Sequence, residues 1–307
     1  MREFKDLSQP YSSAVASETK PSRPSPEDTP FRPKEKVRSI FISDVHLGTK
    51  DCKASELNDF LKHYSCQNLF LVGDIFDGWK ISTVIYWKNS FNRVIRRLLK
   101  LSKQGINVYY ITGNHDEFLR KYANNRFENI QIVNRYTHLT ADNKKLLIIH
   151  GDQFESVTHC SKFWKFVGDF GYDILMSLNR WHNFCRNILG FGNWSLSAFL
   201  KKNNKTARNY ISNYEKAVAY GAGRQGYDGV VCGHIHHAAL KEIDGVHYYN
   251  TGDWVESCTA ISESFNGEMK LHHWLNEPGH HMRMEKKKRR KQAHKKAARA
   301  QKQQEEV

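Results

Sequence analysis

Val37-Arg-Ser-Ile-Phe-Ile-Ser-Asp44-Val-His46-Leu-Gly48 joins a short apolar run directly to two side chains that can bind metal ions. The same pattern recurs in four further clusters, Gly73-Asp-Ile-Phe-Asp77, Gly113-Asn-His-Asp116, His150-Gly-Asp152 and Gly233-His-Ile-His236, which follow the apolar runs 68–72, 107–112, 145–149 and 229–232. Runs this short, rich in β-branched and aromatic residues, predict buried strands. The sequence therefore places polar side chains repeatedly at strand ends, where α/β sheets build their sites.

The five clusters contain seven side chains that could serve as metal ligands: Asp44, His46, Asp74, Asn114, His150, His234 and His236. Seven protein ligands are too many for one ion that must also hold water. They suit two ions that share one carboxylate and keep open positions for water and a phosphate. Mixed carboxylate, imidazole and amide ligands favour Mn²⁺, Fe²⁺ or Zn²⁺ over a metal held by thiolates. We therefore predict a centre of two divalent ions, with Mn²⁺ as the first choice.

The ordered motifs D-x-H, G-D-x-x-D, G-N-H-D, H-G-D and G-H-x-H resemble those of the calcineurin-like metallophosphoesterases, from Asp44 to His236. This resemblance implies an α/β fold, a four-layer α/β/β/α sandwich, and metal-dependent hydrolysis of a phosphoester. It also divides the ligands between two ions that share Asp74: Asp44, His46, Asp74 and His236 at one, and Asp74, Asn114, His150 and His234 at the other. It further implies that His115 faces the leaving group and donates a proton to it or stabilises its charge, and that Asp77 orients His115. A supporting structural role is the alternative for His115.

Within this family the chain is most similar to the UDP-2,3-diacylglucosamine pyrophosphatases of lipid A biosynthesis. The shared features are the H-G-D motif, a helical insertion after it, a Lys/Asn-rich run before a long helix, and Gly252-Asp-Trp254. Those enzymes cleave the pyrophosphate of a lipid-linked sugar nucleotide, giving UMP and lipid X. They typically have G-N-R-D where this chain has His115. A paralogue that acts as a phosphodiesterase, nuclease or nucleotide phosphatase is therefore the alternative.

The segment between His150 and His234 is unusually aromatic. Residues 161–200 contain ten aromatic side chains, which predicts amphipathic helices in a cap at about 156–205, inserted into a domain at 37–280. The cap is interpreted either as an ordinary small core or as an apolar pocket for acyl chains. The basic run that follows it is expected to hold the anionic, lipid-linked substrate through five residues: Lys201, Lys202, Asn204, Lys205 and Arg208.

The two ends of the chain have compositions unlike that of the domain between them. Residues 1–36 are rich in Pro and Ser and predict a disordered segment, with no apolar stretch typical of a secretory signal. Residues 283–307, within a tail at 281–307, carry eleven Lys or Arg and three Glu, a net +8 of the formal +15. That tail is interpreted as a solvated end or as a polybasic arm for anionic lipids or nucleic acid.

The cysteines and the apolar runs indicate a cellular location. The six cysteines form no C-x-x-C pair, and no apolar run approaches the length of a membrane span. We expect a cytoplasmic protein with peripheral contact at the inner membrane. A non-catalytic interaction module is disfavoured because all seven ligands are present.

Regular elements are predicted on both sides of the aromatic segment. Helices are expected at 54–64, 86–104 and 209–221, and strands at 246–250, 258–261 and 269–274. The second helix has apolar residues at helical spacing with Arg and Lys between them, as in a helix packed on a sheet.

Overall fold

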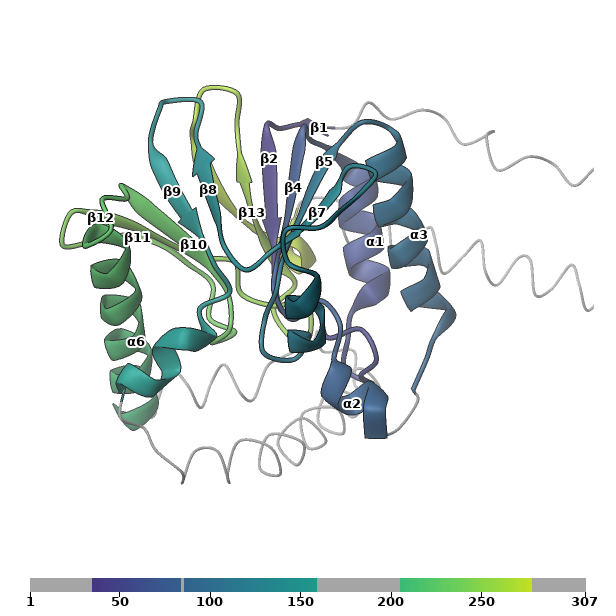
Figure 1. The fold of residues 1–307 in the computed structure, drawn as a ribbon, viewed down its shortest axis with the longest axis horizontal. Helices are drawn as coiled ribbons and strands as arrows, with labels where there is room; N and C mark the ends of the chain where they lie inside the picture. Colours follow the sequence, from purple (N-terminus) through teal and green to yellow (C-terminus); the bar gives the residue numbers. More distant parts are fainter. Residues whose placement is uncertain (1–34, 84–85, 159–204, 278–307) are drawn as a thin grey trace, which may run out of the picture. The chain divides into compact units, whose positions relative to one another are not determined.

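The computed structural model describes residues 35–83, 86–158 and 205–277, and two main β-sheets organise these ranges (Figure 1). The larger sheet has seven strands in the spatial order β14 (Met269–His273), β13 (Thr259–Glu263), β2 (Ser39–Ile42), β4 (Asn68–Val72), β5 (Asn107–Ile111), β7 (Ile130–Val133) and β6 (Arg126–Phe127). The smaller has five, in the order β11 (Ala239–Ile243), β12 (Val246–Asn250), β10 (Gly229–Cys232), β9 (Lys145–Ile148) and β8 (Tyr136–Leu139). A two-stranded pair joins β1 (Glu35–Lys36) to β3 (Tyr64–Ser65).

Four α-helices and three 3₁₀ helices accompany these strands in the described ranges. The α-helices are α1 (Ala54–His63), α2 (Gly78–Thr83), α3 (Asn89–Lys103) and α6 (Lys205–Gly223). The 3₁₀ helices are η1 (Glu117–Tyr122), η2 (Asp152–Thr158) and η3 (Trp274–Asn276). None of the helices in the described ranges is long and apolar enough to cross a bilayer.

The central strands of each sheet run parallel. In the larger sheet β2, β4, β5 and β7 pair in parallel, with Ile40 opposite Leu69 and Leu69 opposite Val108. In the smaller sheet β10 lies between β9 and β12, parallel to both. Parallel strands present their carboxyl ends at one edge of a sheet, and the residues that follow them therefore gather there.

The two sheets pack face to face, and helices cover their outer faces. Phe41, Phe70 and Ile111 of the larger sheet form one buried cluster with residues of the smaller sheet, Ile148 and Val231 among them. Along β2 the neighbours of Phe41 point the other way, into the core formed with α1 and α3. On the far side of the smaller sheet, α6 packs against β10 and β12 (Figure 1). The predicted α/β/β/α order of layers is confirmed.

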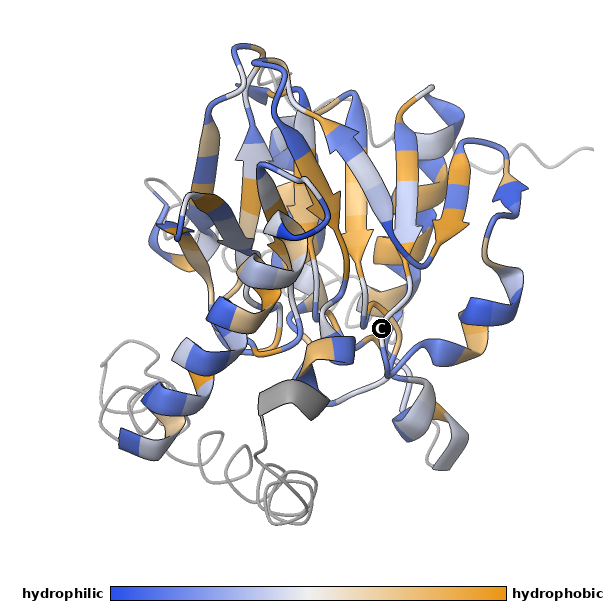
Figure 2. Ribbon diagram, turned by 60° about the vertical axis from the view of Figure 1, so that its left-hand side comes forward, coloured by the Kyte–Doolittle hydropathy of each residue, from blue (hydrophilic) through white to orange (hydrophobic). Residues whose placement is uncertain are grey.

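Amphipathic patterning explains how the helices attach. In α3, Phe91, Val94 and Leu98 are buried, whereas Arg93 and Lys100 are exposed. A helix with apolar residues at this spacing buries one stripe and leaves the other in water. Figure 2 shows the apolar positions concentrated along the strands, with hydrophilic turns between them.

The predicted elements agree with the structure in kind and differ at their ends. The helix expected at 86–104 begins only at Asn89, because Lys88 has an extended backbone with ψ 150°. The helix expected at 209–221 begins at Lys205, which brings Lys205 and Arg208 into its first turns. The segment 1–36, the cap at about 156–205 and the tail at 281–307 lie almost entirely outside the described residues, so these boundaries stay predictions.

Candidate metal centre

All seven predicted ligands follow the carboxyl ends of parallel strands. Asp44 and His46 follow β2, Asp74 follows β4, Asn114 follows β5, His150 follows β9, and His234 and His236 follow β10. Five of them have a left-handed backbone: Asp44, His46, Asp74, His234 and His236, with φ between 50° and 72°. Non-glycine residues adopt this region rarely and at an energetic cost, and such residues cluster at functional sites. The backbone therefore marks these strand ends as constrained.

Glycines in two of the motifs let the loops approach one another closely. A Cβ atom at Gly113 would lie 2.2 Å from Asp74 Oδ1, and one at Gly233 would lie 2.4 Å from Asp44 Oδ2. Any larger residue would therefore collide with a predicted ligand. The G-N-H-D and G-H-x-H motifs start with glycine because no side chain fits at these two contacts.

The first group of ligand atoms comes from Asp44, His46 and His236, and these atoms all lie within 4.8 Å of one another. His236 Nε2 is 3.2 Å from Asp44 Oδ1, and His46 Nε2 is 4.0 Å from it. The other oxygen, Asp44 Oδ2, accepts hydrogen bonds from Ser43 Oγ and from the His234 amide. In the part of the chain that the structure describes, Asp44 Oδ1 and His46 Nε2 are buried without a hydrogen-bond partner.

The second group comes from Asp74, His150 and His234, and these ligand atoms also lie within 4.8 Å of one another. His150 Nδ1 donates to the Val72 carbonyl at 2.9 Å, so Nδ1 carries a proton and Nε2 is directed into the group. Nε2 lies 3.2 Å from Asp74 Oδ2 and 3.2 Å from Asn114 Oδ1. The predicted amide ligand therefore joins this group.

The Asp74 carboxylate lies between the two groups. Asp74 Oδ2 is 3.2 Å from His150 Nε2 in one group and 3.9 Å from His46 Nε2 in the other. Asp74 Oδ1 accepts a hydrogen bond from the His115 amide at 2.9 Å. Burial would raise the pKa of Asp74, but the nearby His150 and His46 outweigh it and lower the pKa. The carboxylate predicted to be shared by the two ions therefore lies within reach of donor atoms from both groups.

The histidine pKa values show how much negative charge the loops concentrate. Burial would lower the pKa of His46, but its contact with Asp77 and the charges of Asp74 and Asp44 raise it to about 9. Burial is likewise outweighed at His150, where Asp74 raises the pKa to about 10. Burial and the charge of His150 lower the pKa of His234 to about 4.

These properties fit divalent cations. Asp44 Oδ1 and His46 Nε2 are buried without a hydrogen-bond partner among the described residues, the oxygen and nitrogen donors converge, and the carboxylates attract positive charge. Buried polar atoms normally find partners, and an unpaired one requires an explanation such as an ion. Carboxylate, imidazole and amide donors are a set that Mn²⁺, Fe²⁺ and Zn²⁺ accept.

His115 and Asp77 lie beside the first group. Asp77 Oδ2 is 3.3 Å from His115 Nδ1 and 3.1 Å from His46 Nδ1. Asp77 Oδ1 accepts a hydrogen bond from the Lys80 amide at 2.9 Å, which holds the carboxylate in place. The indole of Trp79 packs on His115, with ring centroids 4.0 Å apart. The His115 side chain remains 23% exposed, so it can meet a substrate.

Several supporting residues have no signal in the motifs. Ser43 Oγ contacts Thr251 Oγ1 at 2.5 Å as well as Asp44. Thr251 comes from the end of β12, far along the sequence from Asp44, and no local pattern could have revealed it. Asp116 is different, because it belongs to a motif: its carboxylate accepts hydrogen bonds from the Gly113 and Ile75 amides and from the Tyr110 hydroxyl.

The predicted substrate-binding residues are only partly placed. Lys205 and Arg208 are exposed at the start of α6. Lys201, Lys202 and Asn204 lie outside the described residues.

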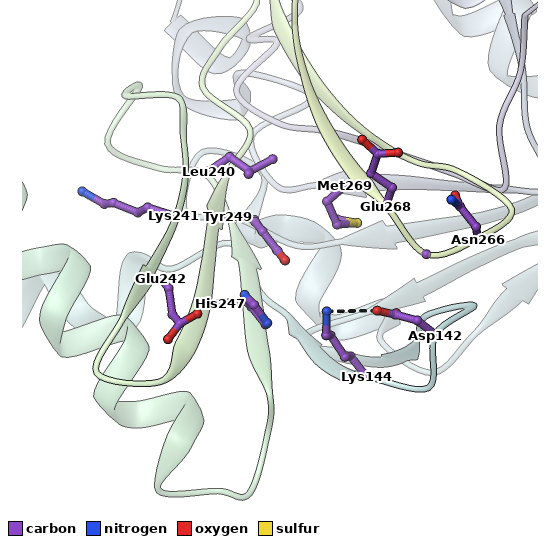
Figure 3. A pocket seen from close by; sticks show the side chains of 11 residues that line it. Asp142, Lys144, Leu240, Lys241, Glu242, His247, Tyr249, Asn266, Glu268 and Met269 are labelled. Atoms are coloured by element: carbon purple, nitrogen blue, oxygen red, sulfur yellow. Dashed lines mark ion pairs between the residues drawn. The ribbon is translucent and has the colours of Figure 1, made fainter.

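A groove lies away from the predicted ligands, at the opposite end of the strands. Figure 3 shows a groove lined by residues of β11, β12, the β13–β14 turn and the β8–β9 turn. Within the β8–β9 turn, Asp142 and Lys144 form an ion pair at 2.9 Å. Lys144 precedes β9, whereas the predicted ligand His150 follows it, so the groove lies at the amino-terminal end of β9, opposite the end that carries the ligands. It contains none of the predicted site residues.

Proteins named UDP-2,3-diacylglucosamine hydrolase are similar in sequence to this chain. The chain is 34% identical over 127 residues to the UDP-2,3-diacylglucosamine hydrolase of Histophilus somni (strain 129Pt), covering 38% of this chain and 49% of that protein. It is 25% identical over 240 residues to the protein of the same name from Psychromonas ingrahamii, covering 73% of this chain and 93% of that protein. The match to the Aliivibrio fischeri protein, at 30% identity over 37% of this chain, spans 47% of that relative's length.

Comparison with solved structures gives weaker likenesses. An archaeal phosphodiesterase aligns with 76% of this chain and 98% of its own, with a TM-score of 0.36 and 14% identity, and adds no weight at that score.

The model of the family described as calcineurin-like phosphoesterase matches residues 37–238, which include every predicted metal ligand. The chain therefore belongs to the calcineurin-like phosphoesterase family.

Proposed function

We propose that this protein is a hydrolase that uses two divalent metal ions, with Mn²⁺ as the first choice, to cleave a phosphoester or pyrophosphate bond. The observation that supports it most is the Asp74 carboxylate, whose Oδ2 lies between two groups of converging donor atoms. The residues that would hold the ions are Asp44, His46, Asp74 and His236 for one, and Asp74, Asn114, His150 and His234 for the other.

When bound, the two ions would supply a nucleophile from water near neutral pH and neutralise charge on the phosphoryl oxygens. The chain's own contribution is to hold the donors in place. Ser43 and the His234 amide occupy Asp44 Oδ2, which leaves Oδ1 as the free donor. The carbonyl of Val72 fixes the His150 ring, which leaves Nε2 as the donor.

His115 is the proposed proton donor to the leaving group. Asp77 lies 3.3 Å from its Nδ1 and would hold the ring so that the other nitrogen faces the substrate. Its partial exposure supports this role, because a proton donor must reach the leaving oxygen within hydrogen-bond distance.

For the substrate we propose a lipid-linked sugar nucleotide such as UDP-2,3-diacylglucosamine, cleaved to UMP and lipid X. The support is the similarity to proteins named UDP-2,3-diacylglucosamine hydrolase and the exposed cations Lys205 and Arg208 on α6. Contact with an anionic membrane through the basic tail is part of this proposal.

A substrate panel tests the proposal. The full chain would be stripped of metal, reloaded with Mn²⁺, and incubated with UDP-diacylglucosamine, UDP-glucosamine, cyclic nucleotides, single-stranded DNA and p-nitrophenyl phosphate. We expect metal-dependent release of UMP from the acylated substrate, identified by mass. Equal rates on acylated and deacylated substrates would refute the lipid assignment. Preferred cleavage of DNA or a cyclic nucleotide would establish the alternative that His115 suggests.

A further inference from the structure

Helix α6 contacts the metal-ligand loops from outside the sheet through two consecutive residues, Tyr214 and Glu215. Both are buried, with 0% and 4% of their surfaces exposed. Glu215 Oε2 accepts a hydrogen bond from Lys241 Nζ at 2.6 Å, and Oε1 lies 3.7 Å from His237 Nδ1. His237 directly follows the predicted ligand His236, so the carboxylate is tied to the loop that carries it.

Tyr214 contacts both ligand loops of the smaller sheet. Its hydroxyl lies so close to Gly151 that a Cβ atom there would be 2.0 Å from the Tyr214 oxygen. Gly151 directly follows the predicted ligand His150. The Tyr214 ring also lies 6.0 Å from the ring of His234. The two loops are themselves joined, because the Gly233 amide donates to the His150 carbonyl at 3.0 Å.

The Glu215 carboxylate is held mainly through one oxygen: Oε2 accepts the hydrogen bond of Lys241, whereas Oε1 has no hydrogen-bond partner among the described residues. A buried carboxylate is costly unless it is paired and hydrogen-bonded. Burial would raise the pKa of Glu215, but His237 and Lys241 outweigh it and lower the pKa, so the group is ionised. Both partners lie in the chain shortly after His236, and the pairing therefore restrains that loop.

A restrained loop is what the ligand geometry requires. His234 and His236 have φ values of 72° and 50°, a conformation that persists only where the surroundings enforce it. Removing a group that orients a metal ligand commonly lowers metal affinity by about 10–100-fold. We infer that Tyr214 and Glu215 are positioning residues for His150, His234 and His236. This inference rests on the proposed function, because it takes these histidines as metal ligands.

The test compares two variants with matched controls on the full chain. Glu215→Gln removes the charge and keeps the shape, and Glu242→Gln does the same at an exposed carboxylate beside Lys241. Tyr214→Phe removes only the hydroxyl, and Tyr220→Phe does so on the same helix at a residue that is 66% exposed. Each protein would be stripped of metal and titrated with Co²⁺, recording the affinity and the visible absorption spectrum. Thermal unfolding of the ion-free proteins would be measured in parallel.

We expect Glu215→Gln to weaken Co²⁺ binding by about tenfold or more and to shift the Co²⁺ spectrum, with both controls unchanged. Tyr214→Phe separates an effect on the ligands from an effect on folding. The Tyr214 hydroxyl is buried without a hydrogen-bond partner among the described residues, so deleting it should leave the ion-free protein at least as stable as the unaltered one. A loss of Co²⁺ affinity without a loss of ion-free stability would then support positioning of the ligand.

Two results would overturn the inference, and they are distinguishable. If the unaltered protein binds Co²⁺ and both variants match its affinity and spectrum, the positioning role is wrong and the proposed function stands. If the unaltered protein binds no Co²⁺, the proposed function fails and this inference fails with it.

Discussion

Replacing Asp74 by Asn is the most direct test of the two-ion proposal. The amide keeps the shape of the side chain and an oxygen that can accept the hydrogen bond of the His115 amide. It removes the charge and the second carboxylate oxygen, which lies 3.2 Å from His150 Nε2 and 3.9 Å from His46 Nε2. One substitution therefore disturbs the ligands of both ions.

The size of the effect follows from the shared position. Losing one preorganised electrostatic contact to a transition state commonly costs about 10²–10³ in rate. Because Asp74 serves both ions, we expect a fall in kcat/KM of at least about 10³-fold, or about 4 kcal/mol. The metal content, measured by mass spectrometry after gel filtration, should fall below two ions per chain.

The matched control is Asp142→Asn, which removes a carboxylate from the ion pair with Lys144 at the other end of the sheet. That variant should keep its metal content and its rate. If Asp74→Asn retained two ions and a rate within tenfold of the unaltered protein, a shared Asp74 carboxylate would be excluded.

Three further results are expected. His115→Ala should lower the rate by about 10²–10⁴-fold while two ions stay bound, and the loss should shrink for p-nitrophenyl esters, whose leaving group needs no proton; equal losses on good and poor leaving groups would rule out His115 as the proton donor. The pKa values of His46 and His150 are raised to about 9 and 10, so both rings are protonated at pH 7 in the ion-free protein. Because a bound ion must displace these protons, Mn²⁺ affinity should rise from pH 6 to pH 8, and calorimetry in buffers of different ionisation enthalpy should detect the proton release. A pH-independent affinity would contradict this. Lys205→Ala and Arg208→Ala should raise KM for the charged substrate at low salt, with the difference fading at high salt; a salt-independent effect on KM would argue against a charge role.

The motifs were sufficient to select the seven candidate ligands because each motif is local. An apolar run followed at once by Asp, His or Asn indicates a buried strand with polar residues at its end, whatever the rest of the chain does. The runs before Asp44, Asp74 and His150 are strands β2, β4 and β9 in the structure. The assignment of the seven residues as ligands is still a proposal, although the structure brings them together.

Other strands carried no usable signal. β7, β8 and β11 were not predicted, and each has exposed or half-buried positions within four or five residues. Strands at or near the edge of a sheet need less apolar surface, and the alternation in such short segments is weak. Their place in the sheets follows from pairing with strands that precede or follow them.

The sequence by itself determined which side chains end the strands, because burial of an apolar run and the chemistry of a side chain are local properties. Tertiary structure decided which atoms meet. The His234 amide contacts Asp44 across 190 residues of chain, and Ser43 contacts Thr251 across 208. Tyr214 and Glu215 reach the ligand loops only because α6 packs on the outer face of the smaller sheet. Contacts at such separations depend on how two sheets and their helices pack together, and no local pattern encodes that packing.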